Sequence, residues 1–371
     1  MVKDNATTTE NIPINAFKGL NKDMSCDGMK YAEGQSYEYD IHESDSFGEE
    51  FRACECPIET FLHCAPPSSV YHKVVMDGNV KKGTDGTEIT SSRITIRERV
   101  KLSEMAGAAV DFIKSKIRLA GNPCDGNVPY DEISKGRDIL RFRTPLSEKP
   151  YTMAASILMS GISAVTKRYS IAKTTNYSSV SVSTDAYSAS ITEENKSIAA
   201  SAGNFGTSLN HGGRSAAVTT GPCSVAAAES KQSATVSTES LSAAVTNGRK
   251  SSASVLCSGS AAVTNGNKSV ASATDVWSTA SANGESSVAC VTGSMCTAKA
   301  GEGNSLAVAW GDKCMASGAL GATLVLTEWD TDYGAYDLIA VRLVTVDGKD
   351  ILPNVPYTLK NGTVTAVRAG K

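Results

Sequence analysis

The sequence predicts a mainly β protein, in which a β-solenoid of 18-residue coils, two nonapeptides to each coil, follows a small α+β N-terminal domain and precedes a β C-terminal cap. Three observations support this fold class: a nine-residue repeat, a regular difference between alternate repeats, and a change of composition on either side of the repeat. We divide the 371 residues into a polar arm (1–12), an α+β domain (13–120), a linker (121–151), the solenoid (152–322) and the cap (323–371).

The nine-residue repeat runs from Thr152 to Ala322 without an insertion or a deletion. Its pattern is S-x-A-x-x-x-G-x-x, with Ser in the first column of fourteen of the nineteen copies. A short fixed period indicates stacked structural units. Because columns one and three admit only small side chains, we expect them to face the core. The opposite choice, with columns two and four inside, stays open.

Alternate repeats differ in column nine, so the structural unit is eighteen residues with two strands and two unlike edges. With strands stacked about 4.8 Å apart, the nine coils from Gly161 to Ala322 predict a rod of about 43 Å. We expect Asn-Gly pairs such as Asn247-Gly248 to supply the positive φ of a tight corner. One column-nine set forms an apolar edge: Tyr169, Tyr187, Phe205, Leu241, Trp277 and Met295. The other set, with one neighbouring Arg, forms a possible anion-binding edge: Lys196, Arg214, Arg249, Lys250 and Lys268.

Each edge carries a hypothesis. A continuous apolar stripe left in water would exceed the patches that soluble monomers expose, so we expect the apolar edge to be covered. A second rod or the helix expected at 103–119 could cover it, and the length of the stripe favours a homo-oligomer through this solenoid edge. The cationic edge is either a solvated edge that prevents aggregation or an anion site, and acidic residues that interrupt it favour the solvated edge.

The N-terminal domain is predicted to mix strands with two helices. Pro57 fits the first turn of a short helix, and Ser103 is expected to cap a longer one whose residues Met105, Ala109, Phe112, Ile113 and Ile117 share one face. We expect strands at 14–20, 29–40, 50–55, 69–78 and 88–102, and helices at 57–65 and 103–119.

The segments on either side of the repeat are predicted to link and to cap it. The linker is rich in Pro, Gly and charge, with one strand expected at 138–143. Residues 152–160 keep the repeat register with apolar turns, which suggests an N-terminal cap. At the other end 323–329 continues the last coil, and Asn361-Gly362 predicts a hairpin. Both caps would keep the open ends of the solenoid from polymerising.

Three motifs in the N-terminal domain carry a resemblance to a family. They are a K-G-x-x-K-D-x-x-C segment at 18–26, an H-A-C-E-x-P-like segment at 52–57 and an S-S-x-I-x-I strand at 91–96. Together they resemble an uncharacterised N-terminal domain of phage and prophage proteins. That family commonly continues into nine-residue repeats and a short C-terminal module similar to 318–362. The resemblance implies a phage setting and supplies no reaction. Arg52 stands where the family often has His, which weakens a catalytic role at that position.

The N-terminal domain offers few residues for catalysis or metal binding. Neither Cys-x-Cys nor His-Cys matches the paired knuckles of a zinc site, so we expect buried thiols, no metal and no cofactor. A nicotinamide-holding set could be drawn from Ser91, Arg93 and Glu98, but a strand of this length yields such a set readily. The dense set of possible metal ligands is Cys26, Cys54, Cys56, His63 and Cys64.

Composition limits the functional classes. The net charge is −3, so nucleic-acid binding is not favoured. The sequence shows no apolar run of membrane length and no signal peptide, so we expect no membrane partner and a cytoplasmic or virion-associated protein. Our hypothesis is a non-enzymatic, phage-encoded structural or interaction protein, whose N-terminal domain binds an unknown protein or small molecule while the solenoid acts as spacer or assembly module. The alternatives are a nucleotide- or NAD-using enzyme domain carried on the solenoid, and a virion-associated, adhesin-like rod.

Overall fold

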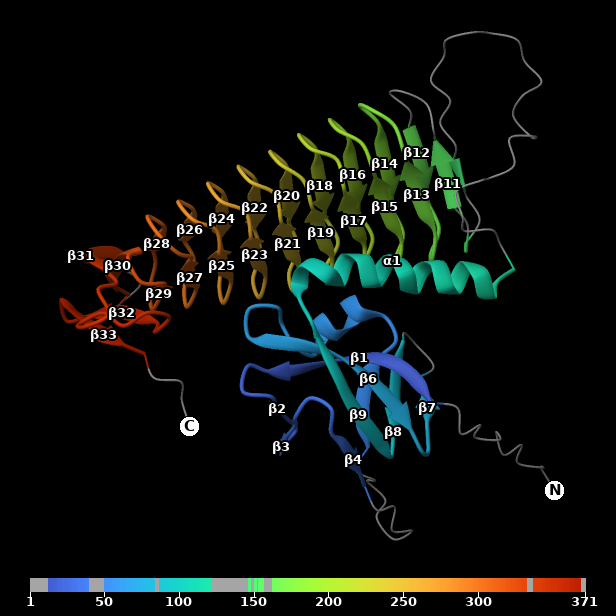
Figure 1. Ribbon diagram of the computed structural model, residues 1–371, viewed down its shortest axis with the longest axis horizontal. Helices are drawn as coiled ribbons and strands as arrows, with labels where there is room; N and C mark the ends of the chain where they lie inside the picture. The colour runs from blue at the N-terminus through green and yellow to red at the C-terminus, as the bar shows by residue number, and fades with distance from the viewer. Residues whose placement is uncertain are drawn as a thin grey trace. The chain divides into compact units, whose positions relative to one another are not determined.

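The computed structural model describes residues 13–39, 50–83, 87–121, 146–147, 150–151, 153–156, 162–331 and 336–367 (Figure 1). The polar arm, the strand expected at 138–143, Thr152 and most of the linker lie outside these residues. The chain divides into two compact units, residues 1–112 and 113–371. In the described ranges, no helix has both the length and the apolar character needed to span a membrane.

The first unit contains a seven-stranded sheet in the order β4-β9-β6-β1-β5-β8-β7 and a separate hairpin, β2-β3. Alternating buried residues of its central strands, among them Leu20, Val74, Met76 and Ile96, form the core. The elements are β1 (Ile14–Asn21), β2 (Ser25–Cys26), β3 (Met29–Lys30), β4 (Ser36–Glu38), β5 (Phe51–Cys54), the 3₁₀ helix η1 (Pro57–Leu62), β6 (Ser69–Asp77), β7 (Lys81–Lys82), β8 (Glu88–Ser91), β9 (Arg93–Val100) and α1 (Leu102–Leu119).

Three local predictions for this domain were wrong. The strand expected at 88–102 is divided into β8 and β9, which lie in different parts of the sheet. The strand expected at 29–40 is divided into β3 and β4, with Gly34 at a φ of +81° in the turn between them. The helix α1 begins at Leu102, so Ser103 lies inside it and is not its cap. Instead, the backbone N–H of Lys101 donates to a carboxylate oxygen of Glu104 at 2.9 Å, the reaching-back half of a capping box. The apolar face predicted for α1 is confirmed, because all five of its named residues are buried.

The predicted solenoid is confirmed as about nine turns of 18 residues. Its strands form two sheets, each with parallel pairing at a shift of 18 residues, as in Ile162↔Val180. One sheet contains β10 (Leu146–Ser147), β12 (Ile162–Val165), β14 (Val180–Ser183), β16 (Ile198–Ser201), β18 (Ala216–Thr219), β20 (Ala234–Ser237), β22 (Ser252–Val255), β24 (Val270–Ala273), β26 (Val288–Val291) and β28 (Leu306–Ala309). The other contains β11 (Met153–Ser156), β13 (Ile171–Thr174), β15 (Ala189–Thr192), β17 (Thr207–Asn210), β19 (Val225–Ala228), β21 (Ala243–Thr246), β23 (Ala261–Thr264), β25 (Thr279–Ala282), β27 (Thr297–Ala300) and β29 (Met315–Gly318).

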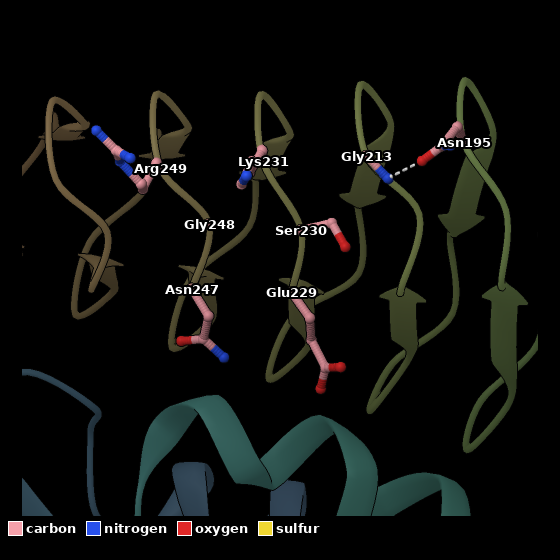
Figure 2. A pocket seen from close by; sticks show the side chains of 8 residues that line it. All are labelled: Asn195, Gly213, Glu229, Ser230, Lys231, Asn247, Gly248 and Arg249. Carbon is pink, nitrogen blue, oxygen red and sulfur yellow. Dashed lines mark hydrogen bonds between the residues drawn. The ribbon is translucent and has the colours of Figure 1, made fainter.

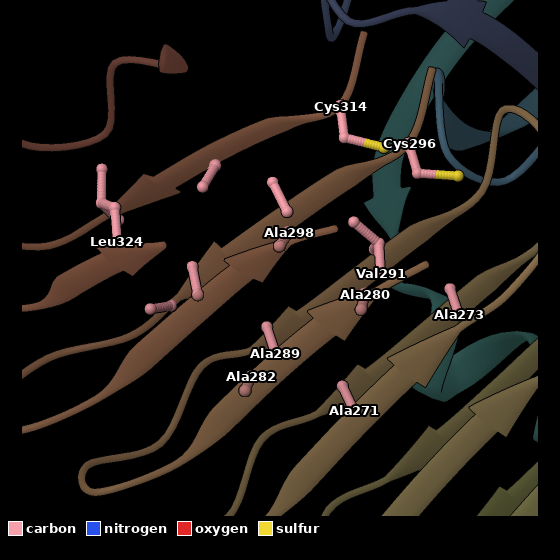
Figure 3. Packing of buried hydrophobic residues seen from close by; sticks show 14 of the residues in the cluster. Ala271, Ala273, Ala280, Ala282, Ala289, Val291, Cys296, Ala298, Cys314 and Leu324 are labelled. Carbon is pink, nitrogen blue, oxygen red and sulfur yellow. The ribbon is translucent and has the colours of Figure 1, made fainter. Parts of the chain in front are cut away.

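The core between the two sheets is made of columns one, three and five. Small side chains of stacked strands lie in rows there (Figure 3), with Ala262, Ala280 and Ala298 fully buried in column three. This agrees with the choice of columns one and three, and column five joins them because it shares their face of the strand.

Column one is a hydrogen-bonded ladder of serines. The backbone N–H of Ser242 donates to Oγ of Ser260 in the next coil at 3.1 Å, and Oγ of Ser242 donates to the carbonyl of Ser240 at 3.2 Å. The ladder satisfies a hydroxyl that would otherwise be costly to bury. Cys296 keeps both roles, since its Sγ accepts from the N–H of Ser278 at 3.4 Å and donates to a carbonyl.

The corners differ from the prediction in where positive φ occurs. It falls in column nine, with values such as +56° at Lys250 and +53° at Tyr187, and the Asn-Gly pairs do not adopt it. The glycine of column seven has another function, because a Cβ on Gly248 would stand 1.9 Å from the carbonyl oxygen of Ser230 in the coil before. These glycines therefore allow close stacking of coils.

The C-terminal module ends both sheets with antiparallel strands. As predicted, β30 (Thr323–Asp330) continues the last coil in parallel with β28, although the pair Leu306↔Thr323 makes that coil one residue shorter. Then β31 (Asp337–Thr345) pairs antiparallel with β30. The predicted hairpin at Asn361-Gly362 is confirmed as β32 (Tyr357–Lys360) and β33 (Thr363–Ala366), which end the other sheet.

Candidate functional site

A cleft of about 260 Å³ lies in the N-terminal domain, where five segments of the chain meet. Strand β1 contributes Phe17, Lys18 and Gly19, and the β2–β3 hairpin contributes Cys26 and Asp27. The remaining lining residues come from β5, from η1 and the turn after it, and from β8: Arg52, Ala53, Cys54, Thr60, His63, Cys64 and Glu88.

Lys18 is the most unusual residue of the cleft, because its side chain is buried. It lies on the face of β1 that also carries Ala16 and Leu20, and only 5% of its surface is exposed. Its ammonium donates to the carbonyl oxygen of Arg52 at 2.9 Å and lies 5.8 Å from the centre of the Tyr31 ring. Among the described residues, no carboxylate forms an ion pair with it. Asp27 and Glu88 line the same cleft without contacting Lys18 as an ion pair, so its buried ammonium is costly and has no carboxylate in direct contact among the described residues.

A tight hairpin places the next two residues. Asp27 and Gly28 both have positive φ, +51° and +77°, and so form a two-residue turn between β2 and β3. The turn brings Cys26 to the cleft, where its Sγ donates to the Asp27 carboxylate at 3.3 Å. The Asp-Gly pair is a hairpin signal that the sequence prediction did not use, because it placed a strand from residue 29 but none at Ser25–Cys26.

The close packing of Cys64 explains why β1 has glycine beside Lys18. A Cβ on Gly19 would stand 2.4 Å from Cβ of Cys64 and 2.7 Å from its Sγ. The hydroxyl of Tyr71 holds the same turn by donating to the carbonyl of Cys64. Gly19 therefore lets the turn after η1 close one side of the cleft.

The three thiols of the cleft are held in the neutral form. Burial raises the pKa of Cys26 to about 11, and it also raises the pKa of Cys54 and of Cys64. A thiolate is the nucleophilic form of cysteine, so at neutral pH these groups act as weak hydrogen-bond donors and apolar surface. The cleft can therefore bind more readily than it can attack.

The structure brings together most of the predicted cysteine and histidine set, but not as ligands of one ion. Cys26, Cys54, His63 and Cys64 line the cleft, whereas Cys56 is buried and its N–H donates to Oγ1 of Thr87. In the described part of the chain, no three His, Cys, Asp or Glu side chains are grouped so that they could hold a metal ion. Arg52 lies at the mouth of the cleft, mostly exposed and 4.0 Å from Glu88.

The set suggested for nicotinamide is not assembled. Arg93 pairs with Glu38 at 2.9 Å and with Asp77 at 3.5 Å, while Glu98 pairs with Lys73 at 3.0 Å. The Ser91 hydroxyl donates to the carbonyl of Arg93 at 2.7 Å. None of these residues lines the cleft.

The predicted apolar edge exists as stacked side chains at one corner of the solenoid. Tyr169, Tyr187 and Phe205 stack with ring centres 5.0 and 4.7 Å apart. Further along the edge Leu241 is half-buried, while Trp277 and Met295 are 63% and 41% exposed. A second rod over this edge stays a prediction.

The predicted cationic edge carries an open groove of about 530 Å³ across four coils (Figure 2). Its lining includes both signs of charge, from Lys231, Arg249 and Glu229, and the N–H of Gly213 donates to the side-chain oxygen of Asn195 at 2.6 Å. Of the five predicted residues only Arg249 lines the groove; Lys196, Arg214, Lys250 and Lys268 are exposed. The anion site on this edge stays a prediction.

The cleft itself was missed at the sequence level, although its signal was present. Alternation along 14–21 puts Lys18 on the same face as Ala16 and Leu20, which is the core face. A lysine at a core position is a candidate for function. The first two family-like motifs, at 18–26 and 52–57, supply half of the residues that line the cleft.

Comparison with known families places one domain. Residues 14–108 match the family described as a domain of unknown function (DUF7666). No curated protein and no solved structure matches the chain. Of the resemblance expected from the sequence, two features are therefore found: an N-terminal domain that matches a family of unknown function, and a β-solenoid after it.

Proposed function

We propose that the N-terminal domain is a binding module for a ligand with an anionic group, and that the β-solenoid carries it as a rigid spacer. The observation that supports this proposal is the buried Lys18 ammonium, which lines a cleft and has no carboxylate partner among the described residues. A phosphate or carboxylate of a ligand would supply a negative charge in contact with Lys18. Because the Lys18 ammonium is already desolvated in the folded protein, binding would not have to remove its water again.

The binding role is non-enzymatic. The neutral thiols of Cys26, Cys54 and Cys64 do not favour a cysteine nucleophile, and Arg52 stands where the resembled family often has His. Following that resemblance, we propose a phage-encoded protein that acts in the host cytoplasm or on the virion. We further propose that copies associate through the apolar solenoid edge.

The test is thermal unfolding of the full chain with inorganic phosphate, citrate, AMP and NAD as probes. We expect saturable stabilisation by at least one probe, amounting to about 2.7 kcal/mol at a concentration one hundred times Kd. Lys18→Met should abolish this effect and should also raise the melting temperature of the free protein, because it removes a buried charge that contacts no carboxylate among the described residues.

The control is Lys73→Met, which removes an exposed lysine of β6 paired with Glu98. It should retain the response to the probe. Stabilisation that persists in Lys18→Met, or no stabilisation by any probe, would refute the proposal. Chromatography of the same samples would show whether AMP or NAD is converted during the incubation, and such conversion would establish the enzyme alternative.

A further inference from the structure

The cleft around Lys18 contains charges of both signs that are not paired with one another. Lys18 supplies a buried ammonium, and Asp27 and Glu88 supply carboxylates, neither of which forms an ion pair with Lys18 among the described residues. A ligand that was only an anion would be attracted by Lys18, but it would also meet two like charges. The cleft is therefore better matched to a ligand that carries both signs of charge.

The two carboxylates differ in the partners that the protein gives them. Glu88 lies 4.0 Å from the guanidinium of Arg52, which supplies a positive charge beside it. Asp27 is exposed, and its carboxylate accepts a hydrogen bond from the Cys26 thiol at 3.3 Å, although a thiol is a weak donor. In the part of the chain that the structure describes, Asp27 forms no ion pair. Asp27 is therefore the carboxylate that a cationic group of a ligand would meet.

Lys18 and Asp27 act on the same two thiols of the cleft. Burial is the main cause that raises the pKa of Cys26 and of Cys64. On both thiols the charge of Lys18 acts to lower the pKa and the charge of Asp27 acts to raise it. Both charges therefore lie near these thiols, within one small cleft to which Phe17 adds apolar surface.

We propose that the ligand of this cleft is a small zwitterion of the size of an amino acid, whose carboxylate binds the Lys18 ammonium and whose ammonium binds the Asp27 carboxylate. The inference rests on the binding function proposed above and names the class of its ligand. The cleft volume of about 260 Å³ is below the range of about 300–1,000 Å³ that is usual for drug-sized ligands, so the cleft is too small to enclose a dinucleotide. A short zwitterion would form a charge-assisted hydrogen bond at each end.

The test is isothermal titration calorimetry of the full chain at pH 7 with glycine, β-alanine, 4-aminobutyrate and 6-aminohexanoate, which separate their two charges by increasing distances. Each is compared with the carboxylate of the same chain length that has no amine: acetate, propionate, butyrate and hexanoate. We expect at least one amino acid to bind about 10-fold or more tightly than its matched carboxylate, because a hydrogen bond to a charged group contributes about that factor.

Three variants assign the two ends of the ligand. Asp27→Asn should remove the preference for the amine and retain carboxylate binding; asparagine also tolerates the φ of +51° at this position, so the turn is kept. Lys18→Met should abolish binding of both series. The control is Glu98→Gln, which changes an exposed carboxylate of β9 outside the cleft and should bind both series as the unmodified chain does. Circular dichroism verifies that each variant is folded.

The outcomes distinguish this inference from the proposed function. If amino acids and carboxylates bound equally and Lys18→Met abolished both, the cleft would be an anion site and the zwitterion would be refuted. A preference for the amine that persisted in Asp27→Asn would also overturn the inference. If neither series bound, the zwitterion would again be refuted, whereas the phosphate, citrate and nucleotide probes would decide the proposed function separately.

Discussion

The threonines of column five provide a direct test of how the solenoid core is stabilised. Thr246 and Thr264 are paired in neighbouring strands, both are fully buried, and within the described structure neither hydroxyl has a hydrogen-bond partner. Column five also accepts valine, since Val255 and Val291 are fully buried in the same column. Thr246→Val and Thr264→Val should therefore fit without rearrangement and increase stability.

The size of the effect follows from the cost of an unsatisfied buried hydroxyl. That cost is about 1–3 kcal/mol, and valine has nearly the same volume as threonine, so no cavity offsets the gain. We expect about 1.5 kcal/mol for each variant and about 3 kcal/mol for the pair. For a domain of this size, the pair should raise the melting temperature by about 6–12 °C.

Thr219→Val is the matched control, because Thr219 is also a fully buried column-five residue but its Oγ1 is 2.8 Å from Oγ of Ser237. Removing that hydrogen bond should cost about 1 kcal/mol, so the same substitution should have the opposite sign. Thermal and urea unfolding followed by circular dichroism measure both. If all three variants changed stability in the same direction, the hydrogen-bond argument would be refuted.

Three further predictions concern the corners, the cleft and the apolar edge. Gly248→Ala should destabilise the solenoid by about 3 kcal/mol or more, because the added Cβ meets a backbone carbonyl. Gly213→Ala is the control and should cost much less, because the nearest atom to its Cβ would be a side-chain oxygen at 3.1 Å. Equal melting temperatures of the two variants would contradict the stacking argument. Iodoacetamide should modify Cys26 at pH 8 on the order of 100-fold more slowly than a free thiol, because the raised pKa of Cys26 leaves little thiolate. The rate of modification should rise until the pH is near 11. Fast modification of Cys26 at pH 8, located by mass spectrometry, would show an activated cysteine. Phe205→Asp together with Trp277→Asp should lower the oligomer mass if the apolar edge is an interface, and an unchanged mass with an unchanged melting curve would show that it is not.

The solenoid could be predicted because its nine-residue repeat continues without an insertion or a deletion and fixes columns one, three and seven. Fixed spacing of small residues set the 18-residue pairing and the core face, as the burial of Ala262 and Ser260 shows. The corner conformation could not be read in the same way. Positive φ was assigned to Asn-Gly because those residues tolerate it best, yet column nine adopts it at Lys250 and Tyr187, where the ladder of backbone hydrogen bonds between coils imposes it.

The candidate site was only half predictable, and the reason is physical. The sequence supplied the chemically reactive types, Cys26, Cys54 and His63, but the raised pKa of the two thiols depends on burial that only the folded domain creates. The decisive residue, Lys18, was not among the candidate residues, and its burial becomes evident when its strand lies between β5 and β6 in the sheet. Burial of its ammonium has a cost that a contacting anion would lower. Its ammonium donates one N–H to the carbonyl of Arg52 and contacts no carboxylate among the described residues, so an anion that bound beside Lys18 would lower the cost of burying this charge.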